Sequence, residues 1–229
     1  MPSPIKVVML GASGAVGTCA LKALLTLPQI TSITTLGRRP LGYQSQIAGL
    51  QLEEKIVDVL DPSSYQAFLH GHSVAICTLG VGQPSKTGRE EFLRVDRDAV
   101  LAFAKACKDA GVSHFSLLSA VGADSKSGFF YPRSKGQLED GLRALKFERL
   151  SLFHPSMILT PKNRYGFTQG LTLAVWPWLD LLLWGPLKPL RGVKVEDLGW
   201  AMARDAAQTG AGEMVLTWDD FQFLNRAKG

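Results

Sequence analysis

The sequence has few of the residues that mark secreted, metal-dependent or fibrous proteins. It contains 3 cysteines and 4 histidines among 229 residues. The cysteines are odd in number, widely separated and set among apolar residues, which favours reduced thiols over a disulfide framework or a zinc site. His70 and His72 flank Gly71 without further ligands at metal-binding spacing, so we expect no metal site. The start, Met1 to Pro4, lacks a basic region and a long apolar region, and we expect a cytoplasmic protein.

The sequence also lacks a long run of basic residues. Lys and Arg number 25 against 20 Asp and Glu, which gives a formal net charge of +5. An anionic cofactor explains this excess as well as a nucleic acid does, and we expect no nucleic-acid partner. Apolar residues make up 46% of the chain and charged residues 20%, which excludes a disordered or collagen-like protein. The length predicts a single α/β domain.

Short apolar segments alternate with amphipathic ones up to residue 155. Ile5–Leu10 lies between Pro4 and Gly11 and is typical of a fully buried strand of a parallel sheet. The same pattern predicts strands at Ser32–Leu36, Ile56–Val59, Ser73–Thr78, His114–Leu118 and Leu150–Phe153. Helices are expected over residues 16–27, 62–69, 92–110 and 131–145. Repeated β-α-β units predict a doubly wound parallel sheet with helices on both faces, the Rossmann class.

The alternation becomes irregular after Pro155. A helix at Val195–Gln208 and a strand at Met214–Thr217 are expected near the end of the chain. We expect one domain over residues 1–229, with a nucleotide-binding core at about 1–155. Residues from about 156 to 229 are expected to form a small cap and substrate region on the carboxyl side of the sheet.

A glycine-rich segment directly follows the first predicted strand and leads into a helix. Its spacing is Gly-x-x-Gly-x-x-Gly, in which the first glycine allows a tight turn, the second a close approach to a pyrophosphate, and the third close packing of helix on sheet. The amino end of the helix adds N–H groups and a positive dipole. The segment therefore predicts a dinucleotide site at Gly11, Ser13, Gly14, Ala15, Val16 and Gly17.

Two arginines follow the second predicted strand. Arg38 stands 21 residues after Gly17, where the residue that contacts the adenosine ribose is usually acidic. Arg38 and Arg39 can instead bind a 2′-phosphate through charge-assisted, bidentate hydrogen bonds, which favours NADP(H) over NAD(H). A solvated loop tip before Pro40 is the alternative. Asp58 is a candidate for the adenine amino group, and an ordinary turn residue is equally consistent with its position.

A tyrosine and a lysine are spaced four residues apart on the helix after the fifth strand. Tyr131 and Lys135 therefore share a helix face, which we expect to point toward the sheet and the cofactor. An ammonium near a phenol favours the phenolate, so Tyr131 is a candidate proton donor to a carbonyl that is reduced by hydride. Lys135 is also a candidate ligand of the nicotinamide ribose. Ser119 is expected to hydrogen-bond the substrate oxygen.

Taken together, these motifs make the sequence resemble the atypical branch of the short-chain dehydrogenase/reductase superfamily. The resemblance covers nearly the whole chain and rests on Gly11–Gly17, Leu36–Arg39, Cys77–Gly80, Arg94–Asp98, His114–Ser119, Tyr131–Gly136 and Leu145–Arg149. It implies that NADPH is held by Ser13–Val16, Arg38, Arg39, Leu79, Gly80, Tyr131, Lys135 and the segment at Ile158. It also implies that Tyr131 is the active-site residue and that a small, rather apolar carbonyl compound is the substrate.

The chain departs from the pattern of these relatives at two positions. Many of them carry adjacent serines after the fifth strand, and here the second position is Ala120. Active members often carry an asparagine where this chain has Asp96, and an ionised aspartate accepts hydrogen bonds but cannot donate them. Both departures bear on turnover rather than on cofactor binding, and Ala120 favours an alternative function, a non-catalytic NADPH-binding regulator that acts through a protein partner or a membrane surface.

Two further features keep more than one interpretation. His154 ends the sixth predicted strand near the expected nicotinamide, and a hydrogen-bonded structural imidazole is the alternative role. Residues 165–187 are rich in leucine and tryptophan and are flanked by basic residues. They fit a buried pocket wall, an oligomer surface, or a peripheral membrane contact. We expect the protein to be a monomer or a homodimer.

Overall fold

A seven-stranded parallel sheet forms the centre of the protein. The computed structural model describes residues 4–43, 49–81, 87–160 and 185–226. The strands are β1 (Ile5–Leu10), β2 (Ile30–Gly37), β3 (Gln51–Ile56), β4 (Val74–Cys77), β5 (His114–Leu118), β6 (Arg149–Phe153) and β9 (Gly212–Leu216). Their order in the sheet is β3-β2-β1-β4-β5-β6-β9, and every neighbouring pair is parallel. This confirms the doubly wound α/β fold.

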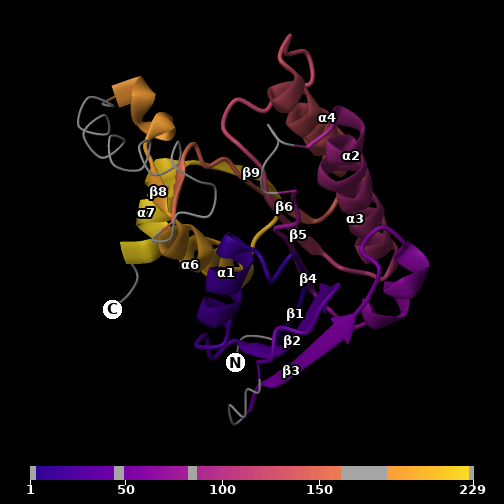
Figure 1. The fold of residues 1–229 in the computed structure, drawn as a ribbon. Helices are drawn as coiled ribbons and strands as arrows, with labels where there is room; N and C mark the ends of the chain where they lie inside the picture. The colour runs from indigo at the N-terminus through magenta and orange to yellow at the C-terminus, as the bar shows by residue number, and fades with distance from the viewer. Residues whose placement is uncertain (1–3, 44–48, 82–86, 161–184, 227–229) are drawn as a thin grey trace.

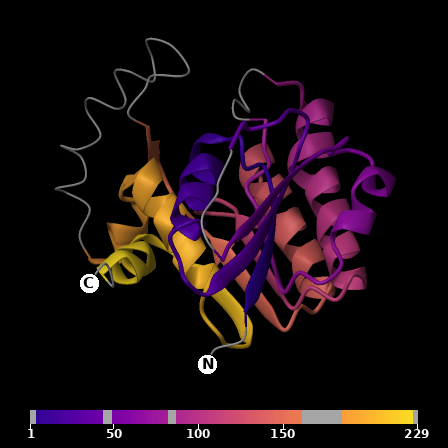
Figure 2. The ribbon, with the colours of Figure 1, turned by 90° about the horizontal axis from the view of Figure 1, so that it is seen from below.

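Helices cover both faces of the sheet (Figure 1; Figure 2). One layer consists of α1 (Ala15–Leu24), α6 (Val195–Ala206) and α7 (Trp218–Arg226). The other consists of α2 (Arg89–Leu93), α3 (Val100–Asp109) and α4 (Phe130–Ala144). The π-helical segment η4 (Arg94–Ala99) joins α2 to α3, so that the expected long helix is present with one locally widened stretch. Two 3-10 turns, η1 (Pro62–Ser64) and η2 (Gln66–Phe68), stand where a helix over 62–69 was expected.

The first strand shows why the sheet is sandwiched in this way. Val7 and Met9 pack into the core beneath α1 and α6, whereas Val8 and Leu10 pack into the core beneath α3 and α4. All four side chains are completely buried. Because alternate side chains of a strand point to opposite faces, a continuous apolar run requires cover on both sides. Burying each of these side chains stabilises the fold by about 1.5–3 kcal/mol.

The third strand was predicted at the wrong residues. It spans Gln51–Ile56 rather than Ile56–Val59. β3 lies at the edge of the sheet and pairs only with β2, so polar side chains such as Glu53 and Lys55 are tolerated in it. Val57 and Val59, which produced the apolar signal, are buried just after the strand, in the core beneath α3.

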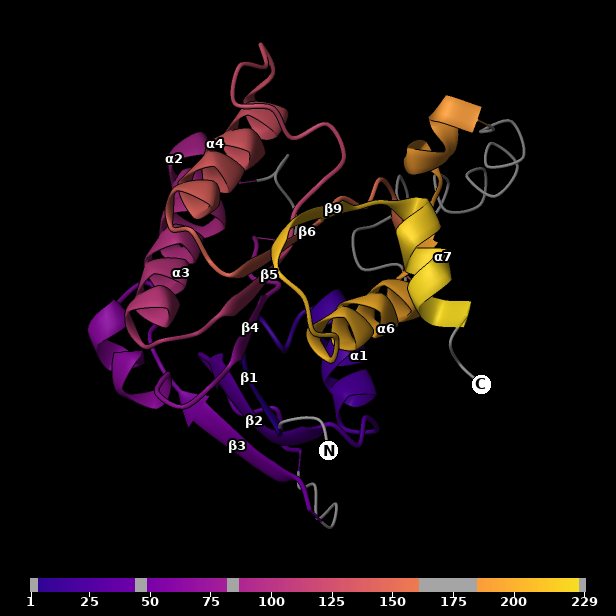
Figure 3. The same ribbon diagram turned by 180° about the vertical axis from the view of Figure 1, so that it is seen from behind.

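The segment after Pro155 returns to the sheet instead of forming a cap throughout. β9 pairs with β6, α6 packs against α1, and α7 packs against α6, as Figure 3 shows from behind. Outside these layers lie the short paired strands β7 (Ile158–Leu159) and β8 (Val193–Lys194) and the 3-10 segment η5 (Gly185–Leu190). The irregular pattern thus reflects an insertion within one β-α-β unit. Most of the Trp-rich segment 165–187 lies outside the described residues.

A buried ion pair fastens α6 to the sheet. Arg149 on β6 hydrogen-bonds Asp205 on α6, and His114 on β5 lies 3.4 Å from the same carboxylate. Burial alone raises the pKa of Asp205, but the neighbouring His114 and Arg149 side chains favour the carboxylate, outweigh burial and hold the pKa below the ordinary value of 3.8. The folded state therefore binds this proton less readily than the unfolded chain does.

We predict that Asp205→Ala lowers the free energy of unfolding by about 3–5 kcal/mol at pH 7, because it leaves the Arg149 charge buried and unpaired. The stabilisation by ionised Asp205 is present above the unfolded pKa and is lost as the pH falls through the lower folded pKa. Urea titrations at several pH values should therefore show a difference between wild type and variant that narrows in acid.

Asp219→Ala is the matched control, since Asp219 is 58% exposed in its ion pair with Lys188. We expect it to cost less than about 1 kcal/mol. Equal losses for the two variants would contradict the importance of the buried pair.

Candidate functional site

The carboxyl ends of β1 and β4 border the candidate cofactor site. The strand order runs outward in opposite directions from these two strands, and ligands of such folds bind at this switch point. A cavity of about 130 Å³ lies here, lined by Gly11, Ser13, Gly14, Leu36, Gly37, Arg38, Val59, Thr78, Leu79 and Gly80. Six of these residues, from three separate segments, were predicted from the sequence as cofactor-binding. The fold therefore brings the glycine segment, Arg38 and the Leu79-Gly80 pair to one place.

Two glycines allow the loop after β1 to pass close to β4. Gly11 has a φ of +91°, and a Cβ atom there would lie 2.6 Å from the nitrogen of Leu79. A Cβ atom on Gly17 would lie 2.2 Å from the carbonyl oxygen of Gly11. Side chains at either position would push the loop away from the sheet.

The amino end of α1 points into this site with its N–H groups available. Gly14 is the N-cap residue, and none of the described side chains caps it. Ala15, Val16 and Gly17 form the first turn, which contains no acidic residue. The side chain of Val16 is buried in the core, so its contribution to a ligand would come from the backbone. Unpaired N–H groups and the helix dipole suit a phosphate at this position.

The two predicted arginines lie at the end of β2, and both are exposed. Arg38 lines the 130 Å³ cavity, whereas Arg39 lines a smaller adjoining cavity together with Ser13 and Lys55. Across residues 4–43, 49–81, 87–160 and 185–226, neither guanidinium forms an ion pair. Both are thus available to an anionic ligand.

Two other predicted cofactor residues lie outside the lining of this cavity. Asp58 follows β3, is exposed, and accepts a hydrogen bond of 2.9 Å from the Leu60 backbone nitrogen. Its neighbour Val59 does line the cavity. Ile158 lies half-buried in β7. The adenine contact of Asp58 and the nicotinamide contact of Ile158 stay predictions.

Tyr131 and Lys135 lie on one face of α4, as their spacing predicted. The Lys135 ammonium is 6.0 Å from the centre of the Tyr131 ring. Tyr131 is 36% exposed, whereas Lys135 is only 5% exposed. The buried ammonium pairs with Asp96 Oδ1 at 3.3 Å, and Asp96 Oδ2 accepts a 2.8 Å hydrogen bond from the Val81 backbone nitrogen. Asp96 therefore holds both Lys135 and the segment that follows β4.

Cys77 lies at the end of β4, within electrostatic reach of Lys135 and Asp96. Burial raises the pKa of its thiol to about 12, although the Lys135 charge opposes the change. A thiol with this pKa stays protonated at neutral pH and is a poor nucleophile. Cys77 is therefore a core residue and not a chemical group of the site.

Ser119 follows β5 and is buried, and its hydroxyl donates a hydrogen bond to Glu139 on α4. His154, at the end of β6, lies with Nε2 2.8 Å from the same carboxylate oxygen. The expected bond from Ser119 to a substrate oxygen stays a prediction.

Asp96 and Glu139 are functional candidates that sequence reasoning did not assign to these roles. Asp96 had been treated only as a departure from relatives, not as the partner of Lys135. Glu139 was overlooked, although its spacing of four from Lys135 continues the Tyr131-Lys135 face of α4. That spacing was the signal that could have identified it.

Comparison with known proteins agrees with this geometry. Residues 11–149 match a protein family described as NAD(P)H-binding. The chain belongs to this family. The matched residues include the glycine segment, the arginine pair, Tyr131 and Lys135, and the expected resemblance to NAD(P)H-binding proteins is confirmed.

Two curated relatives are informative. The chain is 40% identical to rat Protein HTATIP2 over 157 residues, which is 69% of this chain and 64% of the rat protein. It is 34% identical to a protein of Meyerozyma guilliermondii named FMP52, mitochondrial, over 175 residues, which is 75% of this chain and 73% of that protein. The match to the rat protein therefore spans slightly less than two thirds of its length.

Solved structures share the fold at low sequence identity. MoeE5 in complex with UDP-glucose and NAD has a TM-score of 0.69 at 15% identity and covers 98% of this chain and 82% of its own. The Bordetella bronchiseptica enzyme WbmH in complex with NAD+ has a TM-score of 0.65 at 15% identity, covering 93% and 75%. These likenesses establish the Rossmann fold. None of the described helices is both long and apolar enough to cross a membrane.

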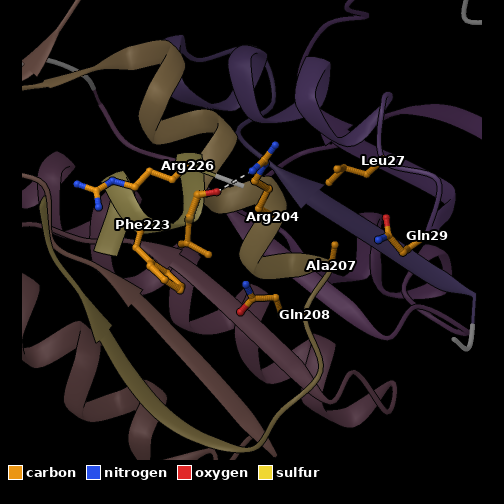
Figure 4. A pocket seen from close by; sticks show the side chains of 8 residues that line it. Leu27, Gln29, Arg204, Ala207, Gln208, Phe223 and Arg226 are labelled. Carbon is orange, nitrogen blue, oxygen red and sulfur yellow. Dashed lines mark hydrogen bonds between the residues drawn. The ribbon is translucent and has the colours of Figure 1, made fainter. Parts of the chain in front are cut away.

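A separate cavity of about 460 Å³ lies at the other end of α1 (Figure 4). It is lined by Leu27, Gln29, Arg204, Ala207, Gln208, Phe223, Leu224 and Arg226. Arg204 there donates a 2.8 Å hydrogen bond to the backbone oxygen of Leu224, near the end of α7. No residue predicted for the cofactor or for catalysis lines this cavity.

We predict that Asp96→Ala destabilises the NAD(P)H-binding domain by about 3–5 kcal/mol, because Lys135 keeps a buried charge without a partner. Asp96→Asn keeps an acceptor for the Val81 nitrogen and should fall between wild type and Asp96→Ala. Urea unfolding measures this order, and quenching of intrinsic fluorescence by NADPH should show affinity declining in the same order.

Asp98→Ala is the control on the same helical segment. Asp98 is 54% exposed in its pair with Arg97, so its loss should cost less than about 1 kcal/mol. If Asp96→Ala were as stable as Asp98→Ala, the proposed role of Asp96 would be wrong.

Proposed function

We propose that this protein binds NADP(H) in preference to NAD(H) and reduces a small carbonyl compound. The observation that carries the cofactor choice is the position of Arg38 and Arg39 at the carboxyl end of β2. An acidic residue there would repel a 2′-phosphate, whereas guanidinium groups bind it through charge-assisted hydrogen bonds.

The residues present fit such a cofactor. Gly11 and Gly14 line the cavity without side chains, and the amino end of α1, which no described side chain caps, supplies N–H donors. Arg38 at the rim of the cavity is placed to hold a phosphate on the adenosine side. Leu79 and Gly80 line the wall on the side of β4, where the ribose would lie.

The proposed reaction requires one hydride and one proton. When bound, NADPH would supply the hydride that adds to the carbonyl carbon. Tyr131 donates its phenolic proton to the carbonyl oxygen, and the nearby Lys135 ammonium stabilises the phenolate that remains. An ammonium has three N–H donors, and Asp96 accepts one of them, so Lys135 keeps donors for a ribose hydroxyl.

A non-catalytic NADPH-binding regulator is the second candidate. It is favoured by Ala120, which stands where many relatives carry a serine, and by the hydrogen bond that directs the Ser119 hydroxyl to Glu139. Such a protein would bind NADPH tightly without turnover and would change its affinity for a protein partner or a membrane surface.

The location, the oligomeric state and the partners of the protein are also proposals. We propose a cytoplasmic monomer or homodimer without a nucleic-acid partner, with residues 165–187 as a pocket wall or peripheral membrane contact. Mitochondria are the alternative location, since fungal relatives are named mitochondrial. Sedimentation with anionic vesicles would test the membrane contact, and imaging of the tagged protein would test the location.

We predict that Arg38→Ala and Arg39→Ala each weaken NADPH binding by about 10- to 100-fold, because each removes a charged hydrogen bond worth about 1.5–3 kcal/mol. NADH affinity should change little, since NADH has no 2′-phosphate. Isothermal calorimetry with both cofactors measures the ratio.

Arg94→Ala controls for the loss of a surface cation, because Arg94 is 59% exposed on the α2-α3 segment. If Arg38→Ala and Arg39→Ala both kept wild-type NADPH affinity, the proposed contact of these arginines with the 2′-phosphate would be excluded.

We predict that Tyr131→Phe lowers turnover by about 10²- to 10⁴-fold, the usual contribution of general acid catalysis, while NADPH affinity stays within a few-fold of wild type. Oxidation of NADPH by a panel of aldehydes, ketones and quinones provides the assay. Tight binding of NADPH without turnover of any member by the wild type would favour the regulator instead.

A further inference from the structure

A carboxylate at the edge of the sheet holds the chain that follows the two arginines. Glu54 lies half-buried on β3, the strand that pairs with β2. Its Oε2 accepts hydrogen bonds from the backbone nitrogens of Leu41 at 2.9 Å and of Gly42 at 3.3 Å. Its Oε1 accepts a third, of 2.9 Å, from the backbone nitrogen of Tyr43. Three consecutive N–H groups therefore share one side chain.

A turn at Gly42 brings these N–H groups to one place. Gly42 has a φ of +72°, in the left-handed region that favours glycine. The side chains on either side of it, Leu41 and Tyr43, are half-buried against the core beneath α1 and α6. An ionised carboxylate only accepts hydrogen bonds, so Glu54 can satisfy all three N–H groups at once. The segment is thus fixed both by its side chains and by its backbone.

This anchored segment is separated from Arg39 by Pro40 alone. The proline ring holds its φ angle at about −65°, so the chain at this point has little freedom. Glu54 and Arg39 line the same small cavity, together with Ser13 of the glycine segment. Ser13 also lines the larger candidate cofactor cavity. The anchor therefore lies directly beside the arginines and the site that they border.

The charge of Glu54 and its hydrogen bonds would act on a bound phosphate in opposite directions. A carboxylate beside Arg39 repels a phosphate through its charge. Hydrogen bonds that fix the neighbouring chain instead favour binding, because less freedom is left to lose when the arginines engage the ligand. Removing the Glu54 charge would therefore strengthen phosphate binding if charge were its main effect, and weaken it if anchoring were.

We propose that Glu54 is a positioning residue for the 2′-phosphate of NADP(H). By anchoring the segment after Arg39, it holds Arg38 and Arg39 where both can engage the phosphate. Because NADH lacks this phosphate, the effect belongs to NADPH binding and not to nucleotide binding in general. The inference rests on the proposed preference for NADP(H) and adds a residue that raises this preference without contacting the ligand.

The principal test measures NADPH and NADH affinities of wild type, Glu54→Gln and Glu54→Asp by calorimetry. Glutamine has the size of glutamate but offers one acceptor oxygen and turns an NH₂ group toward backbone N–H groups. Aspartate keeps the charge but is too short to keep all three hydrogen bonds in place. We expect each variant to weaken NADPH binding by about 10-fold and NADH binding by less than about 3-fold.

Three results of this titration overturn the proposal. Stronger NADPH binding by Glu54→Gln would show that the charge of Glu54 matters more than its hydrogen bonds. Equal losses for NADPH and NADH would show a general role in holding the edge of the sheet. Wild-type affinities in both variants would show no role at all. If Glu54→Gln does not fold, Glu54→Asp decides between these results and the expected one.

Glu53→Gln is the matched control on the same strand. Glu53 points to the opposite face of the sheet from Glu54, pairs with Lys55 at 2.8 Å, and has a side chain that is 39% exposed. Its substitution removes the same charge without touching residues 41–43. NADPH binding should not weaken, and a loss equal to that in Glu54→Gln would overturn the anchor.

A double-mutant cycle tests whether Glu54 acts through the arginines. In an Arg38→Ala/Arg39→Ala background no guanidinium remains to be positioned. Adding Glu54→Gln there should change NADPH affinity by less than about 2-fold. An undiminished loss in that background contradicts the positioning role.

Hydrogen exchange of backbone amides, followed by NMR without cofactor, reads the anchor directly. The amides of Leu41 and Tyr43 should exchange at least about 10-fold faster in Glu54→Gln than in wild type, because the hydrogen bonds that protect them are lost or weakened. In Glu53→Gln they should stay protected. Unchanged exchange in Glu54→Gln overturns the anchor.

The outcomes separate this inference from the proposed cofactor preference. If Arg38→Ala and Arg39→Ala weaken NADPH binding while Glu54→Gln does not, the anchor is wrong and the preference for NADP(H) stands. If the arginine variants keep wild-type NADPH affinity, the proposed phosphate contact fails and the role of Glu54 fails with it.

Discussion

The approach of the β1-α1 loop to the end of β4 is the constraint on which the candidate site depends. Gly11 and Gly17 leave no room for side chains between the loop, the helix and Leu79. This contact sets the amino end of α1 over the opening between β1 and β4, where the strand order changes direction. The position of the backbone expected to bind a phosphate is therefore a consequence of packing, and it does not depend on flexible side chains.

Buried charges organise the rest of the site, and each has a partner of opposite charge, although Arg143 is shared with Asp140 and Glu213. Lys135 pairs with Asp96, which also holds the segment after β4, while Glu139 pairs with Arg143 and collects the hydrogens of two neighbours. A buried charge without a partner is costly, so these pairs restrict where α4 can lie relative to the sheet. The position of Tyr131 on α4 therefore depends on Asp96 and Arg143, through their ion pairs with Lys135 and Glu139 on the same helix.

The sequence predicts the central strands well, because strands covered on both faces read as continuous apolar runs. β3 was misplaced because an edge strand carries polar residues, whereas the apolar signal came from Val57 and Val59, which are buried just after the strand. The return of β9 to the sheet was hidden by the insertion after β6. The glycine segment was recognisable because its pattern is local in the sequence, directly after a strand and before a helix.

The cluster around Glu139 could not be read from spacing to the same degree. Ser119 and His154 lie 20 and 15 residues from Glu139 along the chain, and only the parallel pairing of β5 with β6 brings them together. Helix periodicity could place Glu139 on the same face of α4 as Lys135. It could not show that Ser119 and His154 are hydrogen-bond partners of Glu139, and without them Glu139 resembles an ordinary surface residue paired with Arg143. To predict contacts between residues at the ends of different strands, the order and register of the strands must be known.

The cluster also gives a physical meaning to the two departures from relatives. Position 120 carries no hydroxyl, and the Ser119 hydroxyl already donates to Glu139, so the proposed reduction relies on the Tyr131 phenol as its proton donor. Asp96, in turn, fixes Lys135 through its charge, a task that a neutral asparagine would perform less strongly.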